Sequence, residues 1–240
     1  MSSQLGILYG IGVGPGDPEL LTLKALRVLQ EVPYVFAAAS TKNDYSHALN
    51  IVRSHITKAE VAPLFFPMTN DPEVLAASWQ ENARTVLGVL ERGQDAAFIT
   101  IGDPLTYSTY GYLLKTIKKL NPAVEARTIP GITSYHAAAA LANIPLTEGE
   151  ESFYLVSGAR GGERLREALA ACDNIVMLKT YRQFDKIYQT LEDLQLLECS
   201  TCIVRCGLPD EKVVHDVRSL RGQKMPYLSL LIIKKQGKGY

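Results

Sequence analysis

Residues 8–21 read "LYGIGVGPGDPELL", an apolar strand that runs into a glycine-rich turn and then into the start of a helix. Such a turn is typical of a nucleotide site, but neither familiar phosphate motif is present. No Gly-Lys-Ser or Gly-Lys-Thr of a Walker loop occurs in the chain, and Pro15 or Asp17 replaces the third glycine of G-x-G-x-x-G. Asp17 and Pro18 instead fit a helix N-cap and a first helical residue. We therefore expect a turn of tight backbone geometry that holds an uncharged or cationic ligand.

The composition predicts a folded protein of one large or two ordinary domains. The chain has 240 residues, of which 47% are hydrophobic, and its 25 basic residues equal its 25 acidic residues. This balance lacks the basic excess of a general nucleic-acid binder. No charged N-terminal region precedes an apolar run, and no apolar stretch reaches the roughly 18 residues that cross a bilayer. We expect a soluble cytoplasmic protein with no membrane or nucleic-acid partner.

Three of the four cysteines, Cys199, Cys202 and Cys206, form the pattern C-x₂-C-x₃-C, which raises the question of a metal site. The segment "CSTCIVRC" has the β-branched character of a strand. On a strand, Cys202 and Cys206 would face one side and Cys199 the other, a poor arrangement for a shared metal. Buried cysteines acting as small hydrophobic residues are favoured, and we expect no metal site.

Alternating strand and helix patterns predict an α/β fold of two domains, with mainly parallel sheets covered by helices. The expected strands are 5–12, 33–38, 59–64, 95–101, 124–129, 152–157, 174–179, 199–205 and 227–234, and the expected helices are 18–31, 45–55, 72–92, 106–119, 133–142, 162–171 and 183–194. The linker-like segment "KKLNPAVEA" (118–126) predicts domains 1–120 and 121–240. The last two strands have no obvious helix between them, so part of the second sheet should be antiparallel.

Two further glycine motifs follow expected strands. "IGDPLTYS" (101–108) repeats the Gly-Asp-Pro of the first turn, and Asp103 is interpretable either as a helix cap or as part of a ligand site at a strand's carboxyl end. "IPGITSYHAAAA" (129–140) places Thr133 and Ser134 at the start of a helix of small residues. Its alanines indicate close packing, while the two hydroxyls are candidates for hydrogen bonds to a ligand.

In this order the three motifs, at 12–17, 102–104 and 130–134, resemble the pattern of the tetrapyrrole methylase family. The segments "NIVMLKTYRQFDKIYQTL" (174–191), "IVRCGLPDEKV" (203–213) and "PYLSLLIIKK" (226–235) extend the resemblance over nearly the whole chain. They are most similar to the C20-methyltransferases of corrin synthesis, which act on precorrin-2 or cobalt-factor II. The resemblance implies two α/β domains with S-adenosylmethionine bound in a cleft between them, S-adenosylhomocysteine as product, methyl transfer to a tetrapyrrole carbon, and a homodimer.

The resemblance also assigns site residues. It places cofactor contacts at Pro15, Ile101, Gly102, Asp103, Thr106, Thr133, Ser134, Leu178, Cys206, Gly207 and Leu228. Leu178 departs from the methionine that is common there. Asp103 and Tyr107 are the candidates to accept the proton that leaves the methylated carbon. Because the tetrapyrrole carries many carboxylates, the cations expected at the pocket mouth are Lys42, His47, Lys179 and Arg182.

Other functions fit the same fold. The acceptor could be uroporphyrinogen III, an RNA nucleotide or a modified histidine of a translation factor, although the neutral charge balance speaks against RNA. A non-catalytic regulator that binds S-adenosylmethionine would share the same cofactor residues. The sequence leaves open whether the tetrapyrrole holds cobalt.

Overall fold

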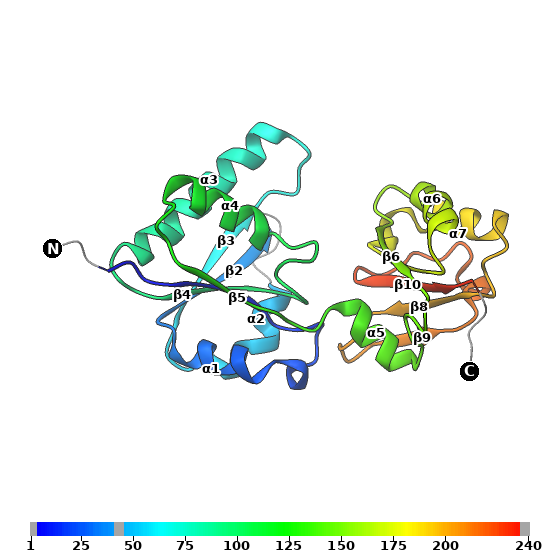
Figure 1. Cartoon of the computed structure of the whole chain (residues 1–240), viewed down its shortest axis with the longest axis horizontal. Coiled ribbons are helices and arrows are strands. Elements are labelled where there is room, and N and C mark those ends of the chain that lie inside the picture. Colours follow the sequence, from blue (N-terminus) through cyan, green and yellow to red (C-terminus); the bar gives the residue numbers. More distant parts are fainter. Residues whose placement is uncertain (1–3, 41–45, 236–240) are drawn as a thin grey trace. The chain divides into compact units, whose positions relative to one another are not determined.

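The structure is a computed structural model that describes residues 4–40 and 46–235. Within these, the chain forms two compact units that divide between Thr133 and Ser134. Each unit contains one five-stranded sheet with helices on both faces (Figure 1). The expected α/β fold is confirmed.

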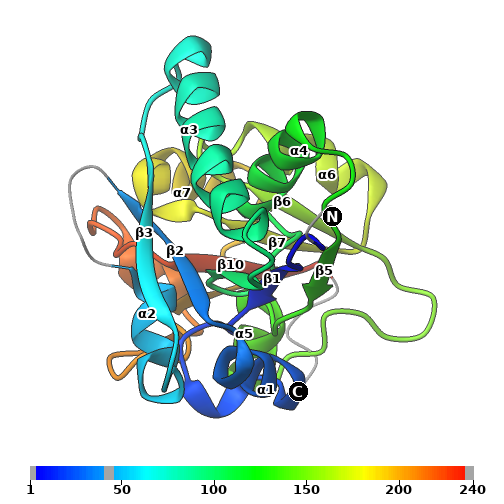
Figure 2. The ribbon, with the colours of Figure 1, turned by 90° about the vertical axis from the view of Figure 1, so that its left-hand side faces the viewer.

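The first unit has an all-parallel sheet of order β3-β2-β4-β1-β5. Its elements are β1 (Leu8–Gly12), the short 3₁₀ helix η1 (Pro18–Leu20), α1 (Leu23–Glu31), β2 (Tyr34–Ser40), α2 (His47–Val52), η2 (Arg53–His55), β3 (Glu60–Phe66), α3 (Pro72–Leu90), β4 (Ala96–Thr100), α4 (Tyr110–Leu120) and β5 (Ala126–Ile129). Helices α3 and α4 cover one face and α1 and α2 the other, and β3 and β5 form the two edges (Figures 1 and 2).

The second unit has a mixed sheet of order β6-β7-β10-β8-β9. Its elements are α5 (Ser134–Ala142), β6 (Phe153–Ser157), α6 (Glu163–Ala171), β7 (Asn174–Leu178), η3 (Thr180–Gln183), α7 (Phe184–Asp193), β8 (Ser200–Val204), β9 (Lys212–Val214), η4 (Val217–Leu220) and β10 (Ser229–Lys234). Strand β10 pairs antiparallel with both β7 and β8, so the expected antiparallel part is confirmed. Strand β9 was not predicted.

Two layers of apolar side chains fill each unit. In the first unit, Phe36, Phe98 and Leu113 pack beneath α3 and α4, and Ile99 and Val35 pack above α1 and α2. In the second unit, the larger cluster lies beneath α6 and α7, and a smaller one, with Ala138 at its centre, lies beneath α5. Strands β4 and β10 are buried along their whole length, and their central residues are accordingly apolar.

The division between the units differs from the expected one. We expected the second domain to begin at residue 121 and to contain the strand at 124–129. That strand is β5, which pairs parallel with β1 from Leu8↔Ala126 to Ile11↔Ile129, so its placement in the second sheet was wrong. The chain leaves the first unit only after Gly131 has contributed to the end of the first sheet.

The expected helix at 18–31 is interrupted. Asp17 caps η1 by accepting the N–H of Glu19, and η1 ends after three residues because Leu21 is extended. Helix α1 then begins with its own cap, Thr22, whose hydroxyl accepts the N–H of Ala25 at 3.2 Å.

Candidate functional site

The three glycine motifs meet where the strands of the first sheet end, along the edge formed by the carboxyl ends of these strands. They follow the carboxyl ends of β1, β4 and β5, which are neighbours in the sheet, although β4 lies some 90 residues from β1 along the chain. The backbones of Gly14 and Gly102 form a two-way bridge: the N–H of Gly102 donates to the carbonyl of Gly14 at 2.7 Å, and the reverse bond is 3.3 Å long. Parallel α/β sheets bind ligands at this kind of edge.

Glycine is required here because the backbones touch. A Cβ atom added to Gly12 would lie 2.5 Å from the carbonyl oxygen of Gly102 and 2.6 Å from the amide nitrogen of Gly131. A Cβ atom added to Gly131 would lie 2.2 Å from that same oxygen. Gly102 differs, because its φ is +69° and a Cβ atom there would meet nothing within 4 Å. The edge therefore presents a packed backbone floor with open space in front of Gly102.

Asp103 joins two of these motifs. One carboxylate oxygen accepts the N–H of Leu105 at 2.9 Å and the hydroxyl of Thr106 at 3.4 Å, and the other accepts the N–H of Gly131 at 3.2 Å. Helix α4 begins only at Tyr110, so the interpretation of Asp103 as a helix cap was wrong. The carboxylate instead fixes the position of the Gly131 loop relative to the turn after β4.

The side chains at this edge carry little charge. Segments 12–17, 101–106 and 130–134 contain two aspartates and no lysine or arginine. Pro15 and Thr133 are buried, and Ile101 packs on the core beneath the α1 and α2 face. Such an edge suits a ligand with a cationic or neutral group and lacks the cations that a phosphate would need.

Tyr107 follows Asp103 on an exposed turn. Half of its side-chain surface is exposed, and its φ of 51° is in the left-handed region, which is uncommon for a non-glycine residue. By contrast Tyr110, three residues on, lies fully buried against Gly10, and this burial raises the pKa of its hydroxyl. Of the two tyrosines, only Tyr107 reaches solvent at this edge.

The predicted residues of the second unit also come together. The carboxyl ends of β7 and β8 flank the start of β10, because β10 runs antiparallel between them. Leu228 accepts the N–H of Arg205 at 3.0 Å, and the carbonyl of Leu178 accepts the N–H of Gly158 at 2.7 Å. Gly207 donates its N–H to the carboxylate of Glu211 at 2.8 Å. Leu178, Cys206, Gly207 and Leu228 thus surround one edge of the second sheet.

Backbone strain marks both edges. Of the non-glycine residues with positive φ in the described chain, Tyr107, Lys179 and Leu228 are predicted site residues, and Arg205 precedes Cys206. Such residues persist where the surrounding structure holds them, and they cluster at functional sites. Arg205 and Leu228 gave no sign of this conformation in the sequence, because neither is a residue type that favours it.

The cysteines do not lie as expected. Cys202 packs beneath α6 and α7, whereas Cys206 packs on the opposite face of the sheet with the cluster beneath α5. The expectation that they share a face was wrong, because β8 ends at Val204 and Arg205 turns the chain with a φ of 53°. In the described part of the chain, no group of three His, Cys, Asp or Glu side chains is placed to hold a metal ion.

The predicted substrate cations fall in different surroundings. Lys42 lies outside the described residues. His47 is the first residue of α2 and is half-buried, behind the cap Ser46. Lys179 and Arg182 are exposed at the end of β7, and the guanidinium of Arg182 lies 5.5 Å from the ring centre of Tyr181.

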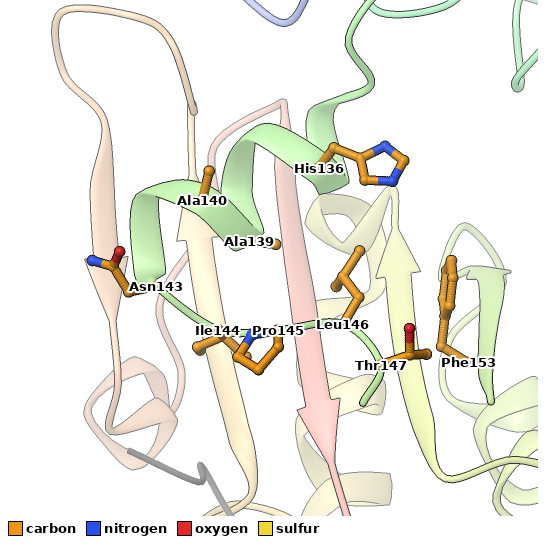
Figure 3. Close-up of a pocket in the computed structure, with 9 residues that line it drawn as sticks. All are labelled: His136, Ala139, Ala140, Asn143, Ile144, Pro145, Leu146, Thr147 and Phe153. Carbon is orange, nitrogen blue, oxygen red and sulfur yellow. The ribbon is translucent and has the colours of Figure 1, made fainter. Parts of the chain in front are cut away.

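One cavity carries none of the predicted residues. It has a volume of about 550 Å³ and lies in the second unit between α5 and the segment that leads to β6 (Figure 3). Its lining residues are His136, Ala139, Ala140, Asn143, Ile144, Pro145, Leu146, Thr147 and Phe153. No sequence motif signals this cavity, because residues of one helix and the loop after it, with Phe153 of β6, form it.

Comparisons with known proteins agree with this geometry. The family model of the tetrapyrrole (corrin/porphyrin) methylases matches residues 7–220. The chain belongs to the tetrapyrrole methylase family. A probable cobalt-precorrin-2 C(20)-methyltransferase of Methanocaldococcus jannaschii is 37% identical to this chain, and the matched region spans 98% of this chain and 99% of the relative. A cobalt-precorrin-2 C(20)-methyltransferase of Salmonella typhimurium is 33% identical over 96% of this chain and 97% of its own length.

More distant members share the fold. A precorrin-2 C(20)-methyltransferase of a Sinorhizobium species is 26% identical over 95% of both chains. The solved structure of uroporphyrin-III C-methyltransferase from Thermus thermophilus, complexed with S-adenosylhomocysteine, has a TM-score of 0.67 at 24% identity and covers 96% of this chain and 99% of its own. The expected family and fold are both confirmed. In the described residues of this methylase, no helix is long and apolar enough to cross a membrane.

Proposed function

We propose that this methylase transfers a methyl group from S-adenosylmethionine to C20 of cobalt-precorrin-2, releasing S-adenosylhomocysteine, as a step of corrin-ring synthesis. The supporting observation is its identity of 33–37% with two enzymes named for that reaction, over nearly the full length of each chain. The relative named for metal-free precorrin-2 is 26% identical. This difference favours the cobalt-loaded acceptor over the metal-free one.

The backbone floor of the first unit fits the methyl donor. Gly102 faces open space, and the surrounding motifs carry aspartates but no basic residue, which suits a sulfonium and an uncharged nucleoside. We assign Pro15, Ile101, Gly102, Thr106 and Thr133 to this site. In the second unit we assign Ser134, Leu178, Cys206, Gly207 and Leu228 to the cofactor on the family resemblance, and the last four of these lie at one edge of the second sheet.

The bound donor supplies a methyl group activated as a sulfonium, so the protein needs no nucleophile of its own. Its task is to hold the acceptor carbon in line with that group and to exclude water. Asp103 would maintain this geometry, because its carboxylate already accepts three hydrogen bonds and fixes the Gly131 loop. Tyr107, exposed beside it, is our candidate to accept the proton that leaves C20 while its own hydroxyl proton passes to solvent water.

The remaining assignments rest on the family resemblance. Lys42, His47, Lys179 and Arg182 would bind carboxylates of the tetrapyrrole, and the enzyme would work as a cytoplasmic homodimer. Light scattering coupled to size-exclusion chromatography measures the oligomeric state, and a monomeric mass would overturn that assignment.

The test is an anaerobic incubation with ¹³C-methyl S-adenosylmethionine. Cobalt-precorrin-2, precorrin-2 and uroporphyrinogen III are offered in parallel, and product mass is followed. We expect a gain of one methyl group on cobalt-precorrin-2, with the label at C20 by ¹³C NMR. Methylation of uroporphyrinogen III alone would overturn the proposal and show that the enzyme acts on a different acceptor of the family. Binding of S-adenosylmethionine without turnover of any acceptor would indicate a regulator.

Tyr107→Phe separates the roles of the two catalytic candidates. If the phenol accepts the proton, kcat should fall by about 10²-fold while the affinity for S-adenosylmethionine is kept. An unchanged kcat would remove Tyr107 from the mechanism.

A further inference from the structure

The arginines of the second unit fall into two groups. Arg166, Arg205, Arg218 and Arg221 each lie within 3.5 Å of a carboxylate oxygen. Arg160, Arg164 and Arg182 have no carboxylate partner among the described residues. An arginine without a partner retains five hydrogen-bond donors for a ligand.

Two of these arginines follow neighbouring strand ends of the second sheet, and Arg164 is the second residue of α6, the helix that follows the β6 loop. Strands β6 and β7 are parallel neighbours that end side by side, with Ser157 opposite Leu178. Arg160 lies three residues beyond the end of β6, and Arg182 lies four residues beyond the end of β7. This is the edge at which Leu178 and Leu228 lie, so the arginines adjoin the proposed cofactor residues of this unit.

The loop that carries Arg160 is held in place by glycines. Gly158 donates its N–H to Leu178, and a Cβ atom on it would lie 2.9 Å from the side chain of Ile187. Gly161 has a φ of +101° and lies against Lys186 of α7, and a Cβ atom on Gly162 would lie 2.2 Å from the hydroxyl of Thr190. All three glycines are buried, whereas Arg160 between them is exposed. The loop therefore packs on α7 and presents Arg160 from a fixed backbone.

Arg182 is also oriented before any ligand binds. Its Nε donates to the hydroxyl of Tyr181 at 2.6 Å, and the ring of Tyr181 packs edge-on against Tyr227 at 5.0 Å. These contacts leave the two terminal guanidinium nitrogens of Arg182 without a hydrogen-bond partner in the described part of the chain. Those two nitrogens are the atoms that fork onto a carboxylate.

We propose that Arg160 binds a carboxylate side chain of the tetrapyrrole acceptor, with Arg164 and Arg182 as neighbouring carboxylate sites. The inference rests on the proposed function for the identity of the acceptor. Its physical basis is separate: planar guanidinium groups match carboxylates in two-point geometry, and none of these three arginines has a carboxylate partner in the described part of the chain. Glu163 and Asp185 on the same segments form no ion pair with them.

The test compares Arg160→Gln with a matched control. Arg166→Gln removes an arginine from α6 that is already paired with Asp193 at 3.0 Å. Binding is measured by fluorescence titration with uroporphyrin III, a stable tetrapyrrole polyacid, and by the KM for cobalt-precorrin-2. We expect Arg160→Gln to weaken uroporphyrin binding and to raise the acceptor KM by about fivefold, the effect of one exposed ion pair. Arg160→Lys should recover part of the loss, and Arg166→Gln should change neither value.

The two possible failures give different results. If Arg160→Gln and Arg166→Gln bind uroporphyrin III equally, and the salt dependence of binding is the same for both, the inference is wrong even if methyl transfer occurs. If the wild-type enzyme methylates no precorrin but Arg160→Gln still weakens uroporphyrin binding, the acceptor assignment is wrong and the carboxylate site stands. Retained affinity for S-adenosylmethionine in Arg160→Gln checks that the fold is intact.

Discussion

Replacing Gly131 with alanine should disable the methyl-donor site by forcing the backbone floor apart. The φ of Gly131 lies outside the left-handed region, so alanine is allowed there on conformational grounds and the effect is purely steric. The new Cβ atom would lie 2.2 Å from the carbonyl oxygen of Gly102 and 2.7 Å from the carbonyl carbon of Gly12. The first distance is about 1.3 Å shorter than the ~3.5 Å separation at which two non-bonded heavy atoms attract each other most strongly.

The magnitude follows from what must move. All the crowded atoms belong to the backbone, and no flexible side chain can turn away. Overpacking costs typically 1–3 kcal/mol, and we expect about 3 kcal/mol here. For a chain of this size this corresponds to a fall of roughly 6–12 °C in the melting temperature. A displacement of about 1 Å at the floor should weaken the binding of S-adenosylmethionine, and the misplaced methyl group should lower the rate of methyl transfer by about a hundredfold.

Calorimetric titration with S-adenosylmethionine, together with thermal melting, measures both effects. Gly88→Ala is the control, because Gly88 lies in α3 with nothing within 4 Å of its Cβ position. That variant should be more stable by about 0.5–1 kcal/mol and should bind the donor normally. If Gly131→Ala melts and binds as the wild type does, the glycine contacts do not determine this site.

Three further predictions concern single groups. Asp103→Ala removes the acceptor of three hydrogen bonds, so it should raise the KM for S-adenosylmethionine more than it lowers kcat. If Asp103→Asn instead loses one limb of the pH–rate profile, Asp103 acts as a general base. The amide of Asn174 holds the pKa of Glu151 below its ordinary 4.5. This carboxylate therefore stabilises the fold above pH 4.5, and its contribution is lost as the pH falls through the lowered pKa. Glu151→Gln should flatten the acid limb of a plot of melting temperature against pH, and an unchanged limb would contradict this. Burial raises the pKa of the Cys202 thiol to about 12 and that of the Cys206 thiol to about 11. At pH 8 both thiols should therefore resist iodoacetamide in the folded protein, which peptide mass mapping measures. Rapid labelling of either cysteine would show that its thiol is accessible and would contradict this prediction.

The glycine motifs were predictable because the residue type itself carries the information. A position that admits no Cβ atom, such as Gly12 or Gly131, must be glycine, so the contact leaves a mark in the sequence. Asp103 was identified because it lies in a Gly-Asp-Pro motif directly after a strand. Its partner, the backbone amide of Gly131, could not be predicted, because a backbone group leaves no mark in the sequence. The periodicity likewise predicted every strand of the first sheet.

The errors arose where the decisive interaction lies far along the chain. Nothing in the residues of β5 reveals that its partner is β1 rather than a strand of the second sheet. Nor does Arg205 reveal the left-handed turn that sends Cys202 and Cys206 to opposite faces. The break before α1 was readable in Thr22, but the apolar periodicity of 18–31 masked it.

The pairing of β5 with β1 has a consequence for synthesis on the ribosome. Until residue 129 has emerged, β1 is an edge strand that pairs with β4 alone, and its buried apolar residues Leu8 and Ile11 have no strand neighbour on the other side. Such an edge is a template for pairing with other chains. A nascent chain of 120 residues would therefore be prone to aggregate, whereas one that exposes some 130 residues holds a complete sheet that can fold before the second unit exists.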